Sequence, residues 1–423
     1  MYFNFIFILI CGFCFHLHAK SFDSNEKTKF NISGYSEGQV GVGTVSTTKG
    51  NIVIDSNVSR KIGDKSLVKA DINFGFGSAM YESRGSFVSI NDAFVTYQSN
   101  DIGKIELGII QPVTEKFRKD ASTFARGTGG INGDYFRYVK YNLDSTNIIL
   151  SPQMPTAGGF ATSNYIGVQN NLGTLQNYFN GARGAKVSVI SNKYHGFTAG
   201  ASFTPSLYDK YTAFGNTQNK IQNLNLQDSN NNFDTINSIS FGINYDKDII
   251  QDANISFSAL YENGKATRLN NNYHWMARED LNAWSVGFNA NYKKLWIGGS
   301  YIDYGRSLFF VSDSTSNTMK IANDGNLVNF DKSYLWNFGL GYITKQWGMS
   351  SSYFIGNYMG NKSQIVNLSL EKDWTLGRII FKHYIEGAYV QVIYPNYYNA
   401  QSILQINNQT NAFVALTGLR VII

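Results

Sequence analysis

Large apolar side chains stand at almost every second position between residues 336 and 354. Trp336, Phe338, Leu340 and Tyr342 share one parity, with Asn and Gly residues between them, and after a four-residue break the alternation restarts at Trp347. A period of two predicts β-strands, because successive side chains of a strand point to opposite faces. The short break predicts a tight hairpin. One face of this hairpin is large and apolar, whereas the other is small, polar and nearly uncharged.

The same alternation recurs along most of the chain and predicts an all-β fold. The alternating runs predict about sixteen strands, which begin near residues 30, 51, 66, 88, 103, 184, 195, 238, 253, 282, 294, 334, 346, 364, 374 and 411. No stretch has the 3.6-residue period of a long amphipathic helix.

The connections between these strands alternate in length. The short ones include residues 192–194, 344–346 and 372–373, and the long, Asn- and Ser-rich ones run over about 205–237, 264–281, 306–333 and 388–410. A β-sandwich has no reason to sort its loops in this way. An up-and-down barrel in a membrane has short turns at one end and long loops at the other. An even strand count then places both termini at the short-turn end.

Burial in lipid accounts for both faces of the alternating strands. In hydrocarbon every backbone N–H and C=O must be paired within the protein, so strands cross a membrane only as a closed sheet. We therefore predict a transmembrane antiparallel β-barrel whose apolar parity meets lipid. The Gly, Ser and Asn parity would form a wet inner wall, because sixteen strands enclose too much space for side chains to fill.

The composition agrees with a barrel whose apolar residues alternate with polar ones, so that the mean hydropathy of the chain stays low. Charged residues are 16% of the 423, below the roughly 25% of typical soluble domains, and aromatics are 15%. The mean hydropathy is slightly negative. Beyond residue 20 no unbroken apolar run approaches the ~20 residues of a membrane helix. The net charge of +6 comes without a basic cluster interleaved with aromatics, so nucleic-acid binding is not expected.

The first 19 residues have the features of a secretory signal peptide. An apolar stretch from Phe3 to Phe15 precedes Leu17-His18-Ala19, which loosely fits a cleavage site, although no Lys or Arg precedes the stretch. The only cysteines, Cys11 and Cys14, lie within it. Residues 20–423 would then be a single barrel domain that has no disulfide, no Cys-based metal site and no Cys nucleophile.

Four segments resemble the general porins of Gram-negative bacteria, closest to the alphaproteobacterial type. They are NDAFVTYQSNDIGKIELG (91–108), YHGFTAGASFTPS (194–206), AWSVGFNANYKKLWIGGSYID (283–303) and AFVALTGLRVII (412–423). The resemblance runs over essentially the whole mature chain and is strongest in the strands. It implies a homotrimer of sixteen-stranded barrels in the outer membrane. It also implies that the assembly machinery reads the C-terminal strand.

The resemblance further implies that the loop after the fifth strand folds inward and constricts the pore. The longest connection of this chain, about residues 112–183, is at that place. Two positions depart from the family. Ile109 stands where many porins have Arg after the fifth strand, and the chain ends in Ile423 rather than Phe.

Charged residues concentrate in the first part of that loop. Between residues 112 and 140, six basic and three acidic residues leave a local charge of +3. In a constriction they would order water in a transverse field and mildly favour anions. The alternative, that they pair among themselves or face outside, stays open. The constriction candidates are Glu115, Lys116, Arg118, Lys119, Asp120, Arg126, Asp134 and Arg137.

Charged residues of the strands are expected to face the pore, because a basic side chain facing lipid at mid-depth costs about 2–4 kcal/mol. Arg60 and Lys186 are included because similar porins have basic residues at these places. The wall candidates are Arg60, Lys69, Asp71, Lys186, Arg378, Lys382, Glu386 and Arg420.

Small residues on the apolar parity of the first strand suggest contact with protein rather than lipid. Gly34, Ser36 and Gly38 share the parity of Ile32 and Val40. We predict that they lie in the trimer interface.

The expected function is passive diffusion of small hydrophilic solutes and ions through an outer-membrane channel, with no enzymatic activity, metal or cofactor. Three alternatives remain. One is a substrate-selective porin whose solute-binding site consists of Tyr135, Phe136 and Tyr138 beside Arg137. Another is a barrel whose long surface loops serve adhesion or host contact. The third is a barrel enzyme, for which His383 is the sole conceivable catalytic base.

Overall fold

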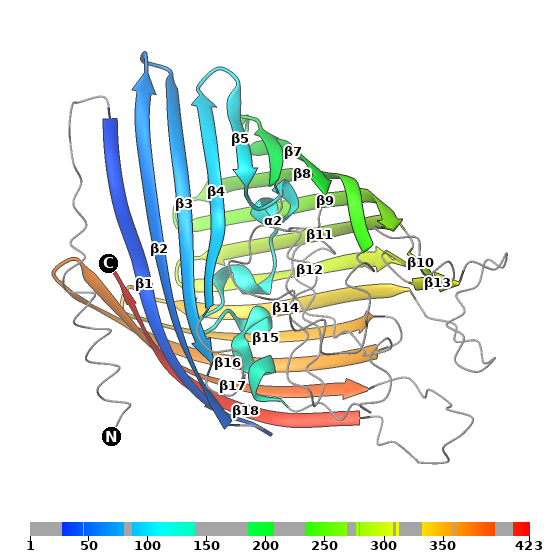
Figure 1. Cartoon of the computed structure of the whole chain (residues 1–423). Coiled ribbons are helices and arrows are strands. Elements are labelled where there is room, and N and C mark those ends of the chain that lie inside the picture. The colour runs from blue at the N-terminus through cyan, green and yellow to red at the C-terminus, as the bar shows by residue number, and fades with distance from the viewer. Residues whose placement is uncertain are drawn as a thin grey trace.

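The structure is a computed structural model that describes residues 28–44, 46–79, 87–139, 185–206, 233–268, 276–278, 280–307, 310–312, 332–358, 361–393 and 409–423. Within these ranges, sixteen strands form one closed antiparallel barrel (Figure 1). No helix in the same ranges is long and apolar enough to cross a membrane.

Each barrel strand pairs with its neighbours in the chain, and the first strand pairs with the last. The barrel strands are β1 (Thr28–Val42), β2 (Ser46–Ile62), β3 (Ser66–Ala79), β4 (Phe87–Ser99), β5 (Gly103–Ile109), β6 (Ala185–Ile190), β7 (Phe197–Ser206), β8 (Phe233–Ile250), β9 (Ala253–Arg268), β11 (Leu281–Tyr292), β12 (Leu295–Gly305), β14 (Ser333–Ile343), β15 (Trp347–Tyr358), β16 (Asn361–Leu376), β17 (Ile379–Ile393) and β18 (Gln409–Ile422).

The barrel closes along the seam between β1 and β18. The backbone N–H of Gly34 donates to the carbonyl of Ile423 at 3.2 Å, and the N–H of Ile423 donates back at 3.0 Å. Every barrel strand therefore has a partner on both sides, as a sheet in hydrocarbon requires.

The predicted fold class and strand count are confirmed, with three local differences. The short strands β10 (Met276–Arg278) and β13 (Phe310–Ser312) form a separate two-stranded sheet that the alternation did not predict. The turn predicted at residues 372–373 lies instead at Gly377 and Arg378, because Trp374 still pairs with Phe381. Gly377 has a φ of 61°, which a tight hairpin turn requires and glycine adopts without strain.

The connections at one end of the barrel are all short, as predicted, whereas those at the other end are not all long. All connections from an even-placed barrel strand to the next are short turns, such as residues 63–65 and 344–346. The opposite end has the long connections, but β1–β2 and β15–β16 are separated there by only residues 43–45 and 359–360.

The two faces of the opening hairpin separate as the alternation predicted. Trp336, Leu340 and Trp347 are exposed on the outside of the barrel, whereas Asn337 and Gly339 are buried on the inside. The same separation holds on β11, where Trp284 and Val286 are exposed and Ser285 is buried. The outer surface of these strands is thus apolar and suited to lipid.

Candidate functional site: the segment inside the barrel

The chain turns into the barrel directly after β5. Residues 110–139, here called the inner segment, contain one helical turn, α2 (Val113–Phe117), and three 3-10 turns, η1 (Ala121–Phe124), η2 (Gly130–Asn132) and η3 (Asp134–Tyr138). Figure 1 shows these turns between the front strands β1–β4 and the strands at the back. Inward folding is therefore confirmed for residues 112–139 of the predicted loop, and residues 140–183 lie outside the described ranges.

The inner segment follows the inner wall around most of the barrel. The α2 turn packs on β7, β8 and β9, η1 on β12 and β14, and η2 on β15 and β16. The η3 turn continues onto β18, β1 and β2. The segment thus touches strands on both sides of the closure seam.

Inward glycines of the wall make room for this segment. A β-carbon at Gly339 would lie 2.8 Å from the Cβ of Ala121, and one at Gly341 would lie 2.9 Å from the Phe124 ring. At Gly348 it would lie 2.8 Å from the Nε of Arg126. These contacts correct one expectation, because the small face of this hairpin is a packing surface for the segment and not a wet wall.

Polar wall side chains bind the backbone of the segment at several positions. The N–H of Val113 donates to Ser202 Oγ at 2.9 Å, and the N–H of Ala121 donates to Asn337 Oδ1 at 3.1 Å. The N–H of Arg126 donates to Ser350 Oγ at 2.9 Å. Buried backbone donors need such partners, so Ser and Asn on the inner parity fix the path of the segment.

Glu386 is the most deeply placed of these anchors and is 1% exposed. Its Oε2 accepts hydrogen bonds from the backbone N–H and the hydroxyl of Thr128, at 2.8 and 2.7 Å. Its Oε1 accepts one from Asn367 Nδ2 at 2.7 Å. One carboxylate therefore joins β16, β17 and the middle of the inner segment.

Most charges of the inner segment are paired. Lys116 binds Glu106, and burial lowers the pKa of Lys116 although this glutamate acts in the opposite direction. The remaining pairs are Arg118 with Glu115 (3.1 Å) and Asp120 (3.0 Å), Arg126 with Glu371 (3.3 Å), and Asp134 with Lys49 (2.6 Å). The local charge of +3 is thus largely neutralised by acids of the wall and of the segment itself.

A row of alternating charges lies on the wall beside the segment. Lys382 pairs with Asp373 at 2.9 Å and with Glu371 at 3.3 Å. Arg420 pairs with Glu37 at 2.7 Å, and this glutamate also accepts the Tyr384 hydroxyl at 3.0 Å. Because each cation of this row has an acid beside it, the row adds little net charge.

Solved structures similar to this barrel include a bacterial porin and other outer-membrane proteins. An anion-selective porin from Comamonas acidovorans is 11% identical, with 94% of this chain and 100% of that chain covered, at a TM-score of 0.52. OmpF of Salmonella typhi in complex with daunomycin is 10% identical, with 93% and 98% covered, at a TM-score of 0.53. The fold is porin-like. At this level of identity, the likeness concerns the fold alone.

Sequence comparison adds relatives but no activity. No protein-family model matches the chain. Proteins described as uncharacterized are 26% identical over 246 residues in Rickettsia felis and 29% identical over 241 residues in Rickettsia bellii. Each match covers 49% of this chain and 52% of the relative, so the chain spans about half the length of the curated relatives it matches.

Six of the eight wall candidates lie on the inner face of the porin-like barrel. Lys69 pairs with Asp71 at 2.6 Å, and Lys186 donates to the carbonyl of Ile110 at the root of the inner segment. The six are Lys69, Asp71, Lys186, Lys382, Glu386 and Arg420. Lys186 and Glu386 contact the inner segment. Lys382 and Arg420 belong to the row of alternating charges beside it.

Two wall candidates are corrected. Arg60 is opposite Thr28 and Val68 in the sheet and shares the outward parity of Val58, so its side chain is exposed on the outer surface near the short-turn end. Arg378 is exposed in the two-residue turn between β16 and β17. The assignment failed because β16 extends three residues beyond the predicted turn.

The remaining candidates lie on the inner segment and on the outward face of β1. Lys119 has no ion-pair partner among the residues that the structure describes, and the side chains of Phe136 and Arg137 lie outside the described set. Gly34, Ser36 and Gly38 lie on the outward parity of β1, as the trimer-interface prediction requires. The structure contains one chain, so that prediction stays untested.

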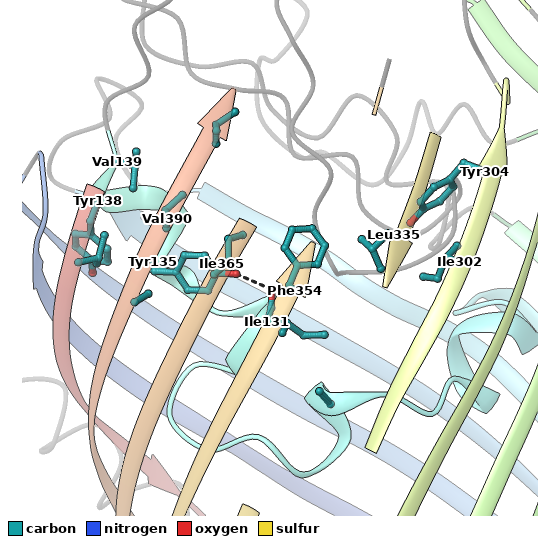
Figure 2. Packing of buried hydrophobic residues seen from close by; sticks show 14 of the residues in the cluster. Ile131, Tyr135, Tyr138, Val139, Ile302, Tyr304, Leu335, Phe354, Ile365 and Val390 are labelled. Atoms are coloured by element: carbon teal, nitrogen blue, oxygen red, sulfur yellow. Dashed lines mark hydrogen bonds between the residues drawn. The ribbon is translucent and has the colours of Figure 1, made fainter. Parts of the chain in front are cut away.

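The strands β15–β18 carry an apolar inner face near the long-loop end, which sequence reasoning missed. Figure 2 shows Tyr135, Tyr138 and Val139 of the inner segment beside Phe354, Ile365 and Val390, and a dashed line from the Tyr135 hydroxyl to the Ile131 carbonyl, 2.8 Å long. Tyr135 and Tyr138 are fully buried. They are therefore packing residues, which removes them from the proposed aromatic ligand site. Both parities of residues 388–392 are largely apolar, and that pattern could have revealed this lining.

Proposed function

We propose that the chain forms a water-filled channel in a bacterial outer membrane through which small hydrophilic solutes and ions diffuse passively. The observation that carries this proposal is the inner segment, which covers the wall from β7 round to β2 and narrows the barrel. Inward residues of β2 and β3, such as Asn57 and Lys69, keep part of their surface accessible. A narrowed barrel with a partly solvated wall supports diffusion limited by width and charge.

Passive diffusion depends on the width and charge of the pore and involves no covalent chemistry. We therefore propose that the chain is not an enzyme and uses no cofactor. The suggested catalytic base, His383, does not lie in the pore. His383 is exposed on the outward parity of β17 and lies 3.2 Å from the Thr417 hydroxyl. A group on the lipid-facing surface has no access to a solute in the pore.

The cellular setting of this channel is also proposed. We expect export by the signal peptide of residues 1–19, insertion by the outer-membrane assembly machinery through the C-terminal strand, and a homotrimer in outer-membrane lipid. Residues 1–19 and most of the long connections, on which the adhesion alternative depends, lie outside the described ranges.

The mild anion preference expected from the inner segment has lost much of its support. It depended on a free local charge of +3, whereas Lys116, Arg118 and Arg126 each have an acidic partner. A charge with a partner at hydrogen-bond distance attracts a passing ion far less than a free charge does. The charges of the inner segment therefore do not favour anions strongly.

Reconstitution of the purified, folded protein into planar bilayers tests the channel. We expect stepwise conductance increases that scale with salt concentration, together with swelling of liposomes in small sugars and exclusion of large ones. A folded barrel that inserts into the bilayer without conducting would refute the proposal. Block of the conductance by one solute class at low concentration would instead identify a substrate-selective porin.

A further inference from the structure

The inner face of the barrel is unevenly covered. Inward side chains along β8, β9, β11, β12 and β14–β17 are mostly buried, because the inner segment and the apolar lining occupy that side. Inward side chains of β2 and β3 remain partly exposed, including 17% of Asp71 and 38% of Lys69. The η3 turn packs on β2, but no helical turn of the segment has comparable packing on β3 or β4.

The partly exposed inward residues of β2 and β3 are here called the open strip, which consists of Asp55, Asn57, Lys69, Asp71 and Asn73. All five share the parity of Lys49, whose side chain reaches Asp134 inside the barrel. Figure 1 shows β2 and β3 on one side of the helical turns, and the strands on which α2, η1 and η2 pack on the other side. Water and solutes therefore have access to this part of the wall.

The charges of the open strip do not cancel. Lys69 and Asp71 neutralise each other at 2.6 Å. Asp55 accepts a hydrogen bond from the Asn73 amide and has no ion-pair partner among the described residues. An amide donor orients a carboxylate without neutralising it, so the strip has one net negative charge at Asp55.

We infer that the open strip is the wall along which ions pass and that Asp55 biases this passage toward cations. This inference rests on the proposed channel and names its specificity-determining residue. An unpaired carboxylate about 4 Å from a monovalent cation changes the local ion population about fivefold, even at the dielectric constant of water. The effect weakens beyond about 8 Å at physiological ionic strength, so a charge on the path outweighs one across the lumen.

Lys119 is a competing charge on the inner segment. Its backbone carbonyl contacts the β11 wall at Gly287. Because this stretch packs on the side of the barrel away from the open strip, Lys119 is expected to act more weakly than Asp55 on ions that follow the strip. The two residues therefore make opposite predictions for the sign of selectivity.

Reversal potentials across planar bilayers in a KCl gradient distinguish the two. The wild-type channel is expected to prefer K⁺ over Cl⁻ by about two- to fivefold. Asp55→Asn, which keeps the shape of the side chain, should abolish most of this preference, and Asp55→Lys should reverse it. Asp101→Asn is the matched control, because Asp101 pairs with Lys65 at 3.3 Å in exposed turns outside the lumen. The ion preference of this variant should equal that of wild type.

The possible outcomes separate this inference from the proposed function. A conducting wild-type channel that prefers Cl⁻, and loses that preference in Lys119→Gln but not in Asp55→Asn, overturns the inference and leaves the channel intact. An unchanged ion preference in both Asp55 variants also overturns it. A folded wild-type protein that does not conduct refutes the channel, and the inference with it.

Discussion

Replacing Glu386 with Ala should release the middle of the inner segment from the wall. Hydrogen bonds to a charged group contribute about 1.5–3 kcal/mol each, so the two bonds from Thr128 to Glu386 contribute about 3–6 kcal/mol to docking, whereas the bond from Asn367 lies within the wall. Burial of a carboxylate that has no cation partner among the described residues offsets part of this contribution. We therefore expect a net loss of about 2–4 kcal/mol in the free energy of docking. That loss raises the undocked population about 30- to 700-fold, at a factor of ten per 1.4 kcal/mol.

Single-channel recording and liposome swelling together measure this release. The Glu386→Ala channel should have a larger and noisier conductance and should admit larger sugars than wild type, because the segment no longer narrows the lumen. Glu386→Gln is the matched control. Its amide oxygen can accept both donors of Thr128, and Asn367 can turn its own amide to face the new NH2 group. The anchor assignment is refuted if a folded Glu386→Ala barrel has the conductance and sugar cut-off of wild type.

Five further substitutions probe the glycines under the inner segment, the two faces of the barrel and the first strand. Gly339→Leu should displace the segment and enlarge the sugar cut-off, because its side chain meets Ala121, whereas Gly387→Leu enters open space and should leave the cut-off unchanged. Leu340→Arg places a charge on the lipid-facing side, where Leu340 is exposed, and should lower barrel stability in urea titrations by about 2–4 kcal/mol. Asn57→Arg on the open strip should cost less than about 1 kcal/mol in the same titration, since that side chain meets water; equal losses would contradict the assigned faces. Gly38→Trp should abolish the trimer on native gels if β1 is buried between copies, and an unaltered trimer would remove β1 from the interface.

The barrel could be predicted from the sequence because alternation reports directly which side chains share a face. All sixteen predicted runs correspond to barrel strands, and the charged side chains of Lys382 and Glu386 lie inward, as the cost of charge in lipid requires. Strand ends were less certain. Trp374 and Leu376 fit a strand as well as a turn, and a shift of the turn by five residues moved Arg378 from the wall into a hairpin turn.

The segment that packs on the inner face of the strands could not be predicted in the same way. Gly341 and Ser350 are suited equally to a wet wall and to close contact with another segment, because neither residue has enough side chain to reveal its neighbour. The pairing of Arg126 with Glu371 joins residues 245 positions apart. No local pattern specifies such a partner, so the free charge assigned to the inner segment was overestimated.

The position of η3 has a consequence for the order in which the barrel forms. This turn follows β5 in the chain, yet it rests on β18, β1 and β2, on both sides of the closure seam. A sheet that still lacks its final strand offers Tyr138 and Val139 only part of their binding surface. The last turn of the inner segment therefore reaches its full packing only when the first and last strands meet, and a chain interrupted before that point lacks this part of the lining.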